Sequence, residues 1–518
     1  MRILMVAAEN DALPGGKVGG VGDVIRDIPV ALADLDQWVD VITPCYGNFS
    51  TLPDAELLGE LSVDFAGAKH PISLWQVPSR RKFHDKVRNL VVHSPLFSQP
   101  KPGVIYSNDT EAPFSTDANR FALFGAAVLS VIKAGLLPRP DVFHLHDWHS
   151  AFVLVLKTWH PDYAEFQSVH TVFSIHNLAL QGIRPLRWDS SSLETWFPNL
   201  SYDTREIGDP RYTDCFNPMR AGIRLADRVH TVSPSYAQEI LLPSNSATGF
   251  IGGEGLEADL RGANDAGRLV GVINGTDYDV EVPRKPTRKK LWTSAQQELL
   301  SWIGRKPEVR SVDFIAWQRL QAWLAEMDDS TMLLTSIGRL TQQKVSLLMQ
   351  PWEGDGLVID ALLQRLGNGA RLLLIGSGDS ALEAEFTRVA ARHENLLFLN
   401  GYAELLADQV YSAGDLFLMP SSFEPCGISQ MLAMRAGQPC LVHAVGGLKD
   451  TIEDGVTGYQ FGGSTPQEQA GALLALVAKL VRSHKRSHRK WQLMRKRAST
   501  VRFEWRDSAA QYLAQLYV

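Results

Sequence analysis

The sequence predicts an α/β fold made of two doubly wound domains, each with a parallel β-sheet covered by helices on both faces. Short apolar runs alternate along the chain with segments of helical periodicity, which is typical of β-α-β units. The 518 residues are enough for two domains that each bury a full core. The alternation breaks off once, at residues 280–329.

The expected strands are short apolar runs that mostly precede Gly, Asp or Ser and then a helical pattern. They are residues 3–7, 38–42, 142–146, 171–175, 229–232, 269–273, 333–337, 371–375, 396–399, 416–419 and 439–442. Residues 280–329 are rich in charge and tryptophan and contain three prolines, so we interpret them as a partly helical connection between the domains.

Composition excludes several classes of protein. A net charge of −6 argues against a general nucleic-acid binder. No apolar run is long enough to span a membrane, and acidic Glu9 follows a first apolar run too short for a signal peptide. The four cysteines, Cys45, Cys215, Cys426 and Cys440, are far apart, which indicates reduced thiols and a cytoplasmic location.

Ligands of open parallel sheets bind at the carboxyl ends of the strands, so the loops after the predicted strands are the candidate sites. The first loop, residues 9–23, contains Lys17 and the glycines Gly19, Gly20 and Gly22. Glycines here allow a phosphate or sugar to approach a helix N-terminus, and Lys17 adds a positive charge. A purely structural turn is the alternative.

Histidines cluster after two further strands. The segment His144 to His149, HLHDWH, invites a metal interpretation, but no other ligands complete such a site, and we favour Asp147 and its neighbours lining a polar cleft. His176 and Asn177 end another strand, where a lone histidine is otherwise most often a core residue. Asp277-x-Asp279 matches a metal–diphosphate pattern that also occurs by chance.

The second half of the sequence contains cations and glycines in the loops after its predicted strands. Arg339 and Lys344 follow a strand and would neutralise a diphosphate, with surface ion pairing as the alternative. Gly376-x-Gly378-x-x-Ala381 matches a dinucleotide fingerprint, which keeps an NAD-dependent oxidoreductase open. The next strand, however, does not end in the acidic residue that this fingerprint requires.

The motif PSSFEPCGISQ is the richest in functional groups. Glu424 lies on a strand-to-helix turn and would accept hydrogen bonds from sugar hydroxyls, while a helix beginning at Gly427 would offer N–H groups to an anion. The basic stretch 482–497 is interpreted as a solvated helix face, with an anionic partner as the alternative.

Together these segments resemble the glycogen/starch synthases, retaining transferases of the GT-B fold. The similar motifs are KVGGVGDV from Lys17, HDWH from His146, SIHNLALQG from Ser174, RLTQQK from Arg339 and FEPCGISQ from Phe423. They occur in the family's order and extend over nearly the whole chain.

The resemblance implies two Rossmann-like domains with an interdomain cleft. Residues 1–270 would be the acceptor-side domain, 271–499 the nucleotide-sugar domain, and a helix within 500–518 would cross back to the first. The implied reaction is transfer of glucose from ADP-glucose, or UDP-glucose, to the non-reducing end of an α-1,4-glucan with retention. No metal, cofactor, nucleic-acid or membrane partner is expected, and no oligomeric state is predicted.

The resemblance also assigns residues. Glu424, His176, Arg339 and Lys344 are the expected catalytic residues. The expected substrate-binding residues are Lys17, Gly19, Gly20, Asp147, Asn177, Asn274, Gly378, Cys426 and Gly427.

The chain departs from the family pattern directly after the lysine of RLTQQK. Val345 replaces the usual Gly, and Leu347 replaces the usual Asp. A non-catalytic glucan-binding homologue and a retaining transferase with a small sugar acceptor therefore remain as alternatives.

Overall fold

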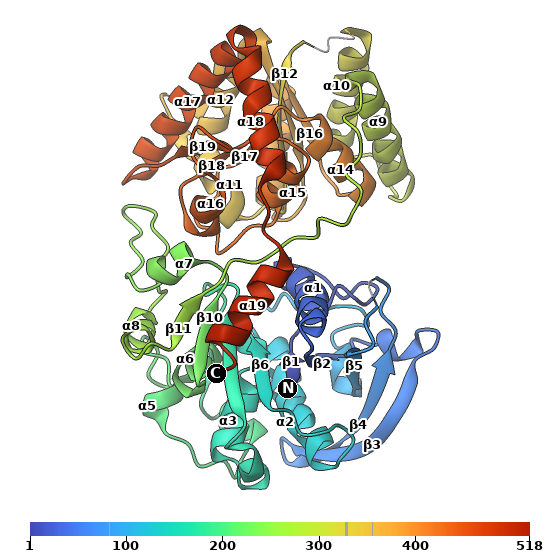
Figure 1. Cartoon of the computed structure of the whole chain (residues 1–518), viewed down its shortest axis with the longest axis vertical. Helices are drawn as coiled ribbons and strands as arrows, with labels where there is room; N and C mark the ends of the chain where they lie inside the picture. Colours follow the sequence, from blue (N-terminus) through green and yellow to red (C-terminus); the bar gives the residue numbers. More distant parts are fainter. Residues whose placement is uncertain (82, 327–329, 355) are drawn as a thin grey trace. The chain divides into compact units, whose positions relative to one another are not determined.

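A computed structural model describes residues 1–81, 83–326, 330–354 and 356–518 (Figure 1). The chain forms two compact units. Unit 1 comprises Met1–Ser244, Gly252–Gly275 and Glu504–Val518, and unit 2 comprises Asn245–Ile251 and Thr276–Phe503. Each unit has helices on both faces of a sheet whose central strands are parallel, so the predicted α/β fold class is confirmed.

The sheet of unit 1 has nine strands in its described residues. Their order across the sheet is β11 (Leu269–Gly271), β10 (Arg228–Thr231), β7 (His170–Ile175), β6 (Val142–His146), β1 (Arg2–Val6), β2 (Trp38–Pro44), β5 (Val87–His93), β4 (Ala68–Val77) and β3 (Glu56–Phe65). The strands from β11 to β5 pair in parallel. Alternate residues of β1 face two different cores, with Leu4 and Val6 in one and Ile3 and Met5 in the other.

One edge of this sheet departs from the predicted parallel pattern. Strands β3 and β4 form an antiparallel hairpin, and β4 pairs antiparallel with β5. None of the three was predicted. Strands β3 and β4 bury only part of their length, which weakens the apolar-run signal, whereas β5 is buried in its second half and its short run of apolar residues was overlooked.

Helices cover both faces of the sheet of unit 1. They are α1 (Gly20–Asp34), α2 (Ser115–Lys133), α3 (Phe152–Trp159), α4 (Leu193–Trp196), α5 (Thr204–Ile207), α6 (Pro218–Leu225), α7 (Pro234–Glu239), α8 (Glu257–Asp265) and α19 (Trp505–Gln515). A short ladder joins β8 (Arg184–Pro185) to β9 (Cys215–Phe216). Short 3-10 turns span Phe49–Thr51, Pro95–Ser98, Trp148–Ser150 and Pro161–Phe166.

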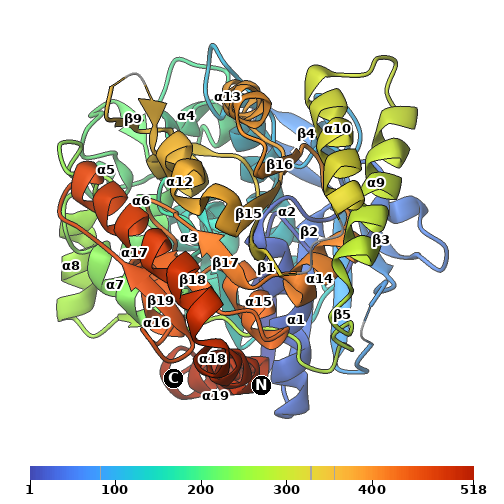
Figure 2. The ribbon, with the colours of Figure 1, turned by 90° about the horizontal axis from the view of Figure 1, so that it is seen from above.

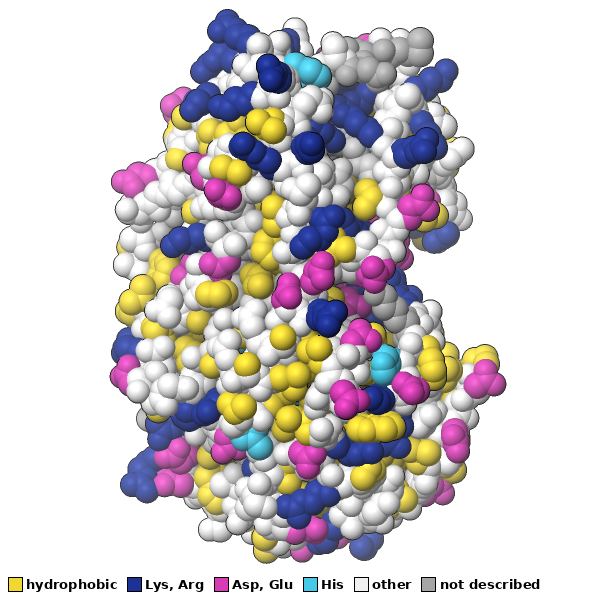
Figure 3. Space-filling model, viewed as in Figure 1, with side chains coloured by type: hydrophobic (Ala, Val, Ile, Leu, Met, Phe, Trp, Pro, Cys, Tyr) yellow, Lys and Arg dark blue, Asp and Glu magenta, His cyan; other side chains and the backbone are white. Residues whose placement is uncertain are grey.

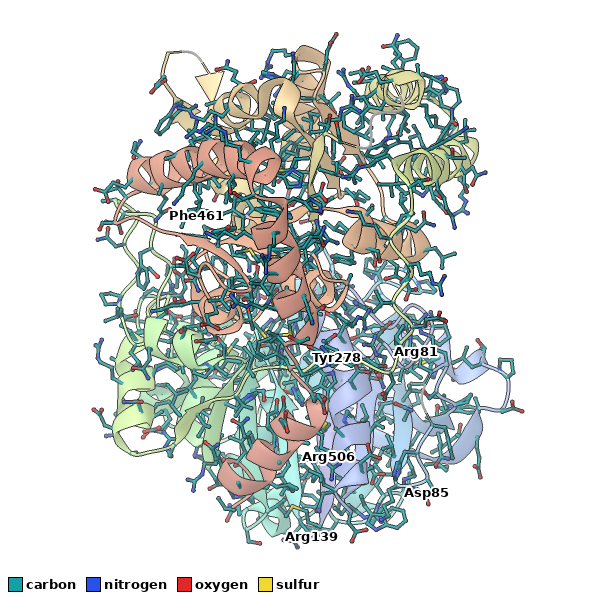
Figure 4. All side chains as sticks on the ribbon, turned by 45° about the horizontal axis from the view of Figure 1, so that its top comes forward. Arg81, Asp85, Arg139, Tyr278, Phe461 and Arg506 are labelled. Carbon is teal, nitrogen blue, oxygen red and sulfur yellow. The ribbon has the colours of Figure 1, made fainter. Side chains whose placement is uncertain are left out.

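The last helix, α19, belongs to unit 1 although it follows the whole of unit 2 in sequence. Trp505 and Tyr512 share a core with Ile3 and Val24. At the point where the chain leaves unit 2, the Phe503 amide donates to the hydroxyl of Tyr278 at 2.9 Å, and the Arg502 guanidinium lies 4.6 Å from the centroid of the same ring (Figure 4).

The sheet of unit 2 is parallel throughout its described strands. Their order is β16 (Leu396–Leu399), β15 (Ala370–Ile375), β12 (Met332–Ile337), β17 (Leu416–Met419), β18 (Cys440–His443) and β19 (Gly458–Phe461). Leu334 and Leu374 face one core, and Leu333 and Ile375 face the other. A small hairpin joins β13 (Pro351–Trp352) to β14 (Gly356–Leu357).

The helices of unit 2 lie on both faces of this sheet. They are α9 (Arg288–Gly304), α10 (Ser311–Glu326), α11 (Gln342–Val345), α12 (Val358–Leu366), α13 (Ser380–Arg392), α14 (Glu404–Ala413), α15 (Ser429–Arg435), α16 (Gly446–Thr451), α17 (Pro466–Arg486) and α18 (His488–Thr500). Ser346–Met349 and Gly367–Gly369 form 3-10 turns.

The interpretation of residues 280–329 as a connection is wrong for most of its length. Helices α9 and α10 lie side by side in both ribbon views (Figures 1 and 2). Their residues Trp292, Leu299 and Trp323 are buried in one core with Leu333 and Ile375 of the sheet. Tryptophans in a charged segment are thus part of the covering layer of unit 2. Residues 327–329 lie outside the described part of the chain.

The basic stretch 482–497 lies on the end of α17 and on α18. Most of its Lys and Arg side chains are exposed, whereas Trp491 and Met494 face the interior. Figure 3 shows dark blue side chains gathered where these two helices lie in Figure 1. Within the described ranges, no helix combines the length and the apolar character that a membrane span requires.

Candidate functional site

The carboxyl ends of β1, β6 and β7, three neighbouring strands of unit 1, hold its predicted site residues. The loop after β1 is shaped by Glu9, a buried carboxylate. Its Oε2 accepts the amide N–H groups of Val18 and Gly19 at 2.7 Å each, and its Oε1 accepts the Tyr106 hydroxyl at 2.8 Å. Gly19 is the N-cap of α1 and Gly20 its first residue, so Glu9 holds the glycines at the helix start.

Lys17 lies in this loop with 40% of its side chain exposed. Its ammonium donates to Asp23 at 2.6 Å, and Asp23 also accepts from Arg26. The positive charge predicted for this loop is therefore present, but one carboxylate is already beside it.

The residue after β6 binds the backbone that follows β7. Asp147 has a left-handed backbone, with φ of 57°, and is buried. Its Oδ1 accepts the backbone N–H of His176 at 2.8 Å and that of Asn177 at 3.4 Å. Burial raises the pKa of Asp147 to about 7 in spite of these two hydrogen bonds. The structure thus brings Asp147, His176 and Asn177 together.

Buried histidines of the neighbouring strands β6 and β10 lie close to these residues. His146 Nδ1 is 3.0 Å from His176 Nε2. His144 bonds Tyr517 and Ser174, at 2.7 Å each, and Ser174 bonds His230 at 2.7 Å. Burial lowers the pKa of His176 to about 4 and that of His230 to about 3. All are therefore neutral at pH 7.

Asn274 belongs to the same unit but is not part of this hydrogen-bond network. It is buried, and its Oδ1 has no hydrogen-bond partner among the described residues. The next residue, Gly275, lies so close to Trp505 that an added Cβ would be 2.5 Å from the Trp505 backbone nitrogen.

The cations of unit 2 follow β12. Arg339 is exposed and makes no hydrogen bond or ion pair with any residue in the described ranges. Its loop packs tightly on the glycine loop after β15, because Cβ atoms at Gly376 and Gly378 would lie 2.1 Å from Gly338 O and 2.4 Å from Leu340 O. Close packing of two strand-end loops therefore explains the glycines of the dinucleotide-like fingerprint.

Lys344 and Glu424 form an ion pair across 80 residues of sequence. Glu424 is buried, and Lys344 keeps 28% of its side chain exposed. The Lys344 ammonium and the Ser421 hydroxyl, at 3.1 Å, both donate to Oε2 of Glu424. Within the described residues Oε1 accepts no hydrogen bond, so it can receive one from a ligand hydroxyl.

The segment carrying Glu424 is held from both sides. The His443 imidazole bonds the Ser421 carbonyl oxygen at 2.8 Å and stacks on Phe461, with the ring centroids 5.2 Å apart. The Gly447 amide donates to Glu424 O at 3.0 Å. Glu424 is therefore fixed by backbone contacts as well as by Lys344.

Cys426 and Gly427 continue this segment toward α15. Gly427 has a φ of +78°, which favours glycine, and the Gln430 side chain donates to the Cys426 and Gly427 carbonyls at 3.1 and 3.0 Å. The helix predicted from Gly427 begins at Ser429. A Cβ at Gly447 would lie 2.3 Å from Cys426 O, so this turn also needs a glycine beside it.

Val345 does not distort the loop that it ends. Its φ of −131° is accessible to a β-branched residue. The Val345 and Leu347 side chains are both buried in a core of unit 2 with Val358. Two apolar residues thus anchor the Lys344 loop in the hydrophobic core of unit 2.

The metal interpretations find no support in the geometry. Among the described residues, no three His, Cys, Asp or Glu side chains are grouped so as to hold a metal ion. His144 and His146 bond other side chains, His149 packs against the rings of Tyr106 and Phe121, and the Asp279 amide donates to Asp277 Oδ1 at 2.9 Å.

Two residues were missed by sequence reasoning. Glu9 was named only as the start of its loop, although an acidic residue directly after the first buried strand is an unusual signal. His146 was treated as one of a histidine cluster, and its bond to His176 depends on pairing between β6 and β7 that sequence does not show.

Known proteins resemble this chain over nearly its whole length. Residues 2–262 match the family model for the starch synthase catalytic domain, and residues 331–479 match that for glycosyl transferases group 1. A glycogen synthase of Streptococcus equi subsp. equi (strain 4047) is 33% identical, covering 99% of this chain and 98% of its own. A glycogen synthase of Anaeromyxobacter sp. (strain Fw109-5) is 34% identical over the same shares of both chains.

A solved structure is also similar over the whole length. The catalytic domain of starch synthase IV from Arabidopsis thaliana, bound to ADP and acarbose, superposes with a TM-score of 0.74 and 25% sequence identity. The match covers 100% of this chain and 98% of that one.

Proposed function

Because the chain belongs to the glycogen/starch synthase family, we propose that it transfers glucose from ADP-glucose to the non-reducing end of an α-1,4-glucan with retention. The donor is supported by the similar starch synthase, which was solved with ADP bound. The enzyme is a glycosyltransferase of the GT-B fold.

The observation that carries the proposal is the charged edge of unit 2. Exposed Arg339 and the ammonium of Lys344 follow β12, and Lys344 contacts the buried carboxylate of Glu424 after β17. Strands β12 and β17 are neighbours, so these groups share the edge where ligands of parallel sheets bind. Two cations beside one hydrogen-bond acceptor suit a diphosphate joined to a sugar.

The charges match the reaction. As the C1–O bond to the diphosphate breaks, negative charge grows on the leaving group, and Arg339 and Lys344 stabilise it there. Removing one such group from an active site typically costs about 2.7–4 kcal/mol of transition-state stabilisation. Glu424 Oε1 accepts a glucose hydroxyl, and Cys426 and Gly427 place backbone amides beside the sugar or phosphate, with Gly378 nearby in the adjoining loop.

Unit 1 supplies the remaining groups in this proposal. His176, Asp147, Asn177 and Asn274 line sugar-binding positions of unit 1, and Lys17 with Gly19 and Gly20 offers a cation and a helix start to a phosphate or sugar. The acceptor O4 attacks C1 on the face from which the diphosphate departs, and its proton passes to a phosphate oxygen. The bond from O4 to C1 forms as the bond from C1 to the diphosphate oxygen breaks. Because both bonds lie on the same face of the sugar, the configuration is retained without a protein nucleophile or a metal.

We place the enzyme in the cytoplasm. All four cysteines are free thiols, three of them buried, which suits a reducing compartment.

The test is turnover of ADP-glucose and UDP-glucose on a glycogen primer. We expect transfer from ADP-glucose, and loss of about 100- to 1,000-fold in kcat in Arg339→Ala. Arg388→Ala, which removes an exposed arginine of the same unit, is the matched control and should keep the wild-type rate. A purified wild-type chain that binds glycogen but turns over neither donor would establish the non-catalytic alternative instead.

A further inference from the structure

The imidazole of His176 is held by a second imidazole. His146 is paired with Ser174 across β6 and β7, which places its side chain beside His176 two residues further on. Their Nδ1 and Nε2 atoms lie 3.0 Å apart, and the ring centroids are 5.3 Å apart with planes inclined by 30°. Both rings are buried. Nε2 of His176 is therefore occupied within the protein, and Nδ1 is the nitrogen left for a ligand.

The protonation of this pair follows from its surroundings. Burial lowers the pKa of both imidazoles below neutrality, so each carries one N–H and one lone pair. His146 Nε2 is buried and has no partner among the described residues. Unpaired buried N–H groups are rarer than unpaired acceptors, which favours the lone pair at this nitrogen. The hydrogen of His146 then lies on Nδ1 and is donated to His176 Nε2.

The His146 ring is itself kept in place by packing. It stacks on His144, with centroids 4.3 Å apart and planes 23° apart. His144 is fixed at both nitrogens, by Tyr517 and by Ser174. The next residue, Asp147, binds the His176 backbone N–H at 2.8 Å. The end of β6 thus fixes both the backbone and the ring of His176 through two consecutive residues.

We propose that His146 is a positioning residue of the transferase, which fixes the tautomer of His176 so that Nδ1 presents an N–H donor to an oxygen of the bound sugar. The inference rests on the proposed function, in which His176 lines a sugar-binding position. A neutral donor at Nδ1 binds a sugar oxygen and does not remove its proton. The tautomer therefore decides what His176 does in the reaction.

Two nearly isosteric variants separate hydrogen bonding from shape. His146→Asn keeps a polar atom close to the position of Nδ1, whereas His146→Leu replaces it with a methyl group. We expect His146→Leu to lower kcat by about 10- to 100-fold, as loss of histidine-orienting partners does elsewhere, with little change in the KM for ADP-glucose. His146→Asn should recover most of the rate.

The matched control is His230→Leu, which removes another buried histidine of the same cluster. His230 bonds Ser174 and makes no hydrogen bond to His176 in the described structure. It should lower thermal stability about as much as His146→Leu while keeping kcat near the wild-type value. Equal kcat values for His146→Asn and His146→Leu, or an equal kcat loss in His230→Leu, would overturn the positioning role.

The tautomer is read directly by NMR of the protein labelled with ¹⁵N-histidine, with His176→Gln assigning the signal. We expect Nδ1 of His176 to be protonated in the wild type and the Nε2–H form to appear in His146→Leu. A wild-type signal from the Nε2–H form, or an identical signal in the Leu variant, would overturn the inference alone. Absence of any transfer by the wild type would overturn the proposed function, whatever the tautomer.

Discussion

The carboxyl-end edges of the two sheets differ in the burial and the charge of their functional groups. In unit 1 the ends of β6 and β7 are built from buried groups, with the uncharged imidazoles of His146 and His176 and the carboxyl of Asp147 joined by hydrogen bonds. In unit 2 the edge carries exposed Arg339 and the partly exposed Lys344. Burial gives fixed positions but penalises charge, whereas partial exposure keeps cations charged at low cost. The comparison teaches that unit 1 is suited to orienting a neutral sugar and unit 2 to meeting a diphosphate.

The largest expected effect comes from breaking the charged edge. Lys344→Met should lower kcat by about 100- to 1,000-fold, because a cation facing the leaving group is lost. It also leaves the buried Glu424 carboxylate without its ion-pair partner, so stability should fall as well.

The double variant Lys344→Met with Glu424→Gln separates these two effects. Calorimetry should show stability recovered relative to Lys344→Met, because the unpaired buried charge is gone, while turnover of ADP-glucose stays low. Recovery of turnover together with stability would show that Lys344 serves only to neutralise Glu424.

Acid should unfold unit 1 before unit 2. Burial lowers the pKa of six histidines in the described part of unit 1, but of only two, His443 and His484, in the described part of unit 2. A lowered pKa means that the unfolded chain binds more protons, so stability present above about pH 6.5 is lost as the pH falls toward the folded values. At pH 5 the loss is about 2 kcal/mol for a histidine whose folded pKa is about 3 to 4, as for His149, His176 and His230.

Asp147 acts in the opposite direction. Its pKa, raised to about 7, makes the folded state bind more protons, so its own contribution improves as the pH falls from 7 toward 4. Burial also raises the pKa of Asp117, and we expect these two carboxyls not to offset six imidazoles. Hydrogen exchange at pH 7.5 and pH 5 should show protection lost first in β6, β7 and β10. Earlier loss in the strands of unit 2 would contradict the comparison.

Two glycines test how tightly each edge is packed. A Cβ at Gly182 would lie 2.1 Å from the Trp148 ring, and one at Gly376 would lie 2.1 Å from Gly338 O. Each Gly→Ala variant should lose about 1–3 kcal/mol of stability through overpacking. We expect Gly376→Ala to raise the KM for the donor and Gly182→Ala to leave it nearly unchanged.

Gly304→Ala is the control for both, because no atom lies within 4 Å of its added Cβ. Chemical denaturation measures the three variants on one scale. If Gly376→Ala proved no less stable than Gly304→Ala, the close packing of the two strand-end loops would be disproved.

The smallest effect is expected at Lys17, the cation of unit 1. Its ion pair with Asp23 is partly exposed, so Lys17→Ala should change stability by less than about 1 kcal/mol. If Lys17 contacts the donor, the KM for ADP-glucose rises while the melting temperature stays nearly constant. A fall in melting temperature with an unchanged KM would mean that Lys17 only supports the glycine loop.

Parallel strands were the features that the sequence predicted best. Buried runs such as residues 396–399 and 416–419 were placed correctly, because strands covered on both faces are continuously apolar. The hairpin of β3 and β4 was not predicted, because its strands are only partly buried and contain charged residues among the apolar ones. Helices α9 and α10 were mistaken for a connection because charged residues and prolines hid a buried tryptophan face.

The sequence predicted which residues belong to the candidate site better than it predicted their hydrogen-bond and ion-pair partners. Loop position after a strand singled out Arg339, Lys344, Glu424 and His176. The partners of these residues come from distant segments, as in the bond from Lys344 to Glu424 and the bond from His176 to His146. Such contacts depend on strand order, which periodicity does not reveal.

The course of the chain through the two units bears on how the protein is synthesised. Unit 2 is almost continuous in sequence, whereas unit 1 closes only with Glu504–Val518, whose Tyr517 bonds His144 of the sheet. Domains usually fold in the order in which they leave the ribosome, from the N-terminus onward. Here unit 1 must wait for Glu504–Val518, and the face that α19 covers stays exposed to chaperones until that segment has left the ribosome.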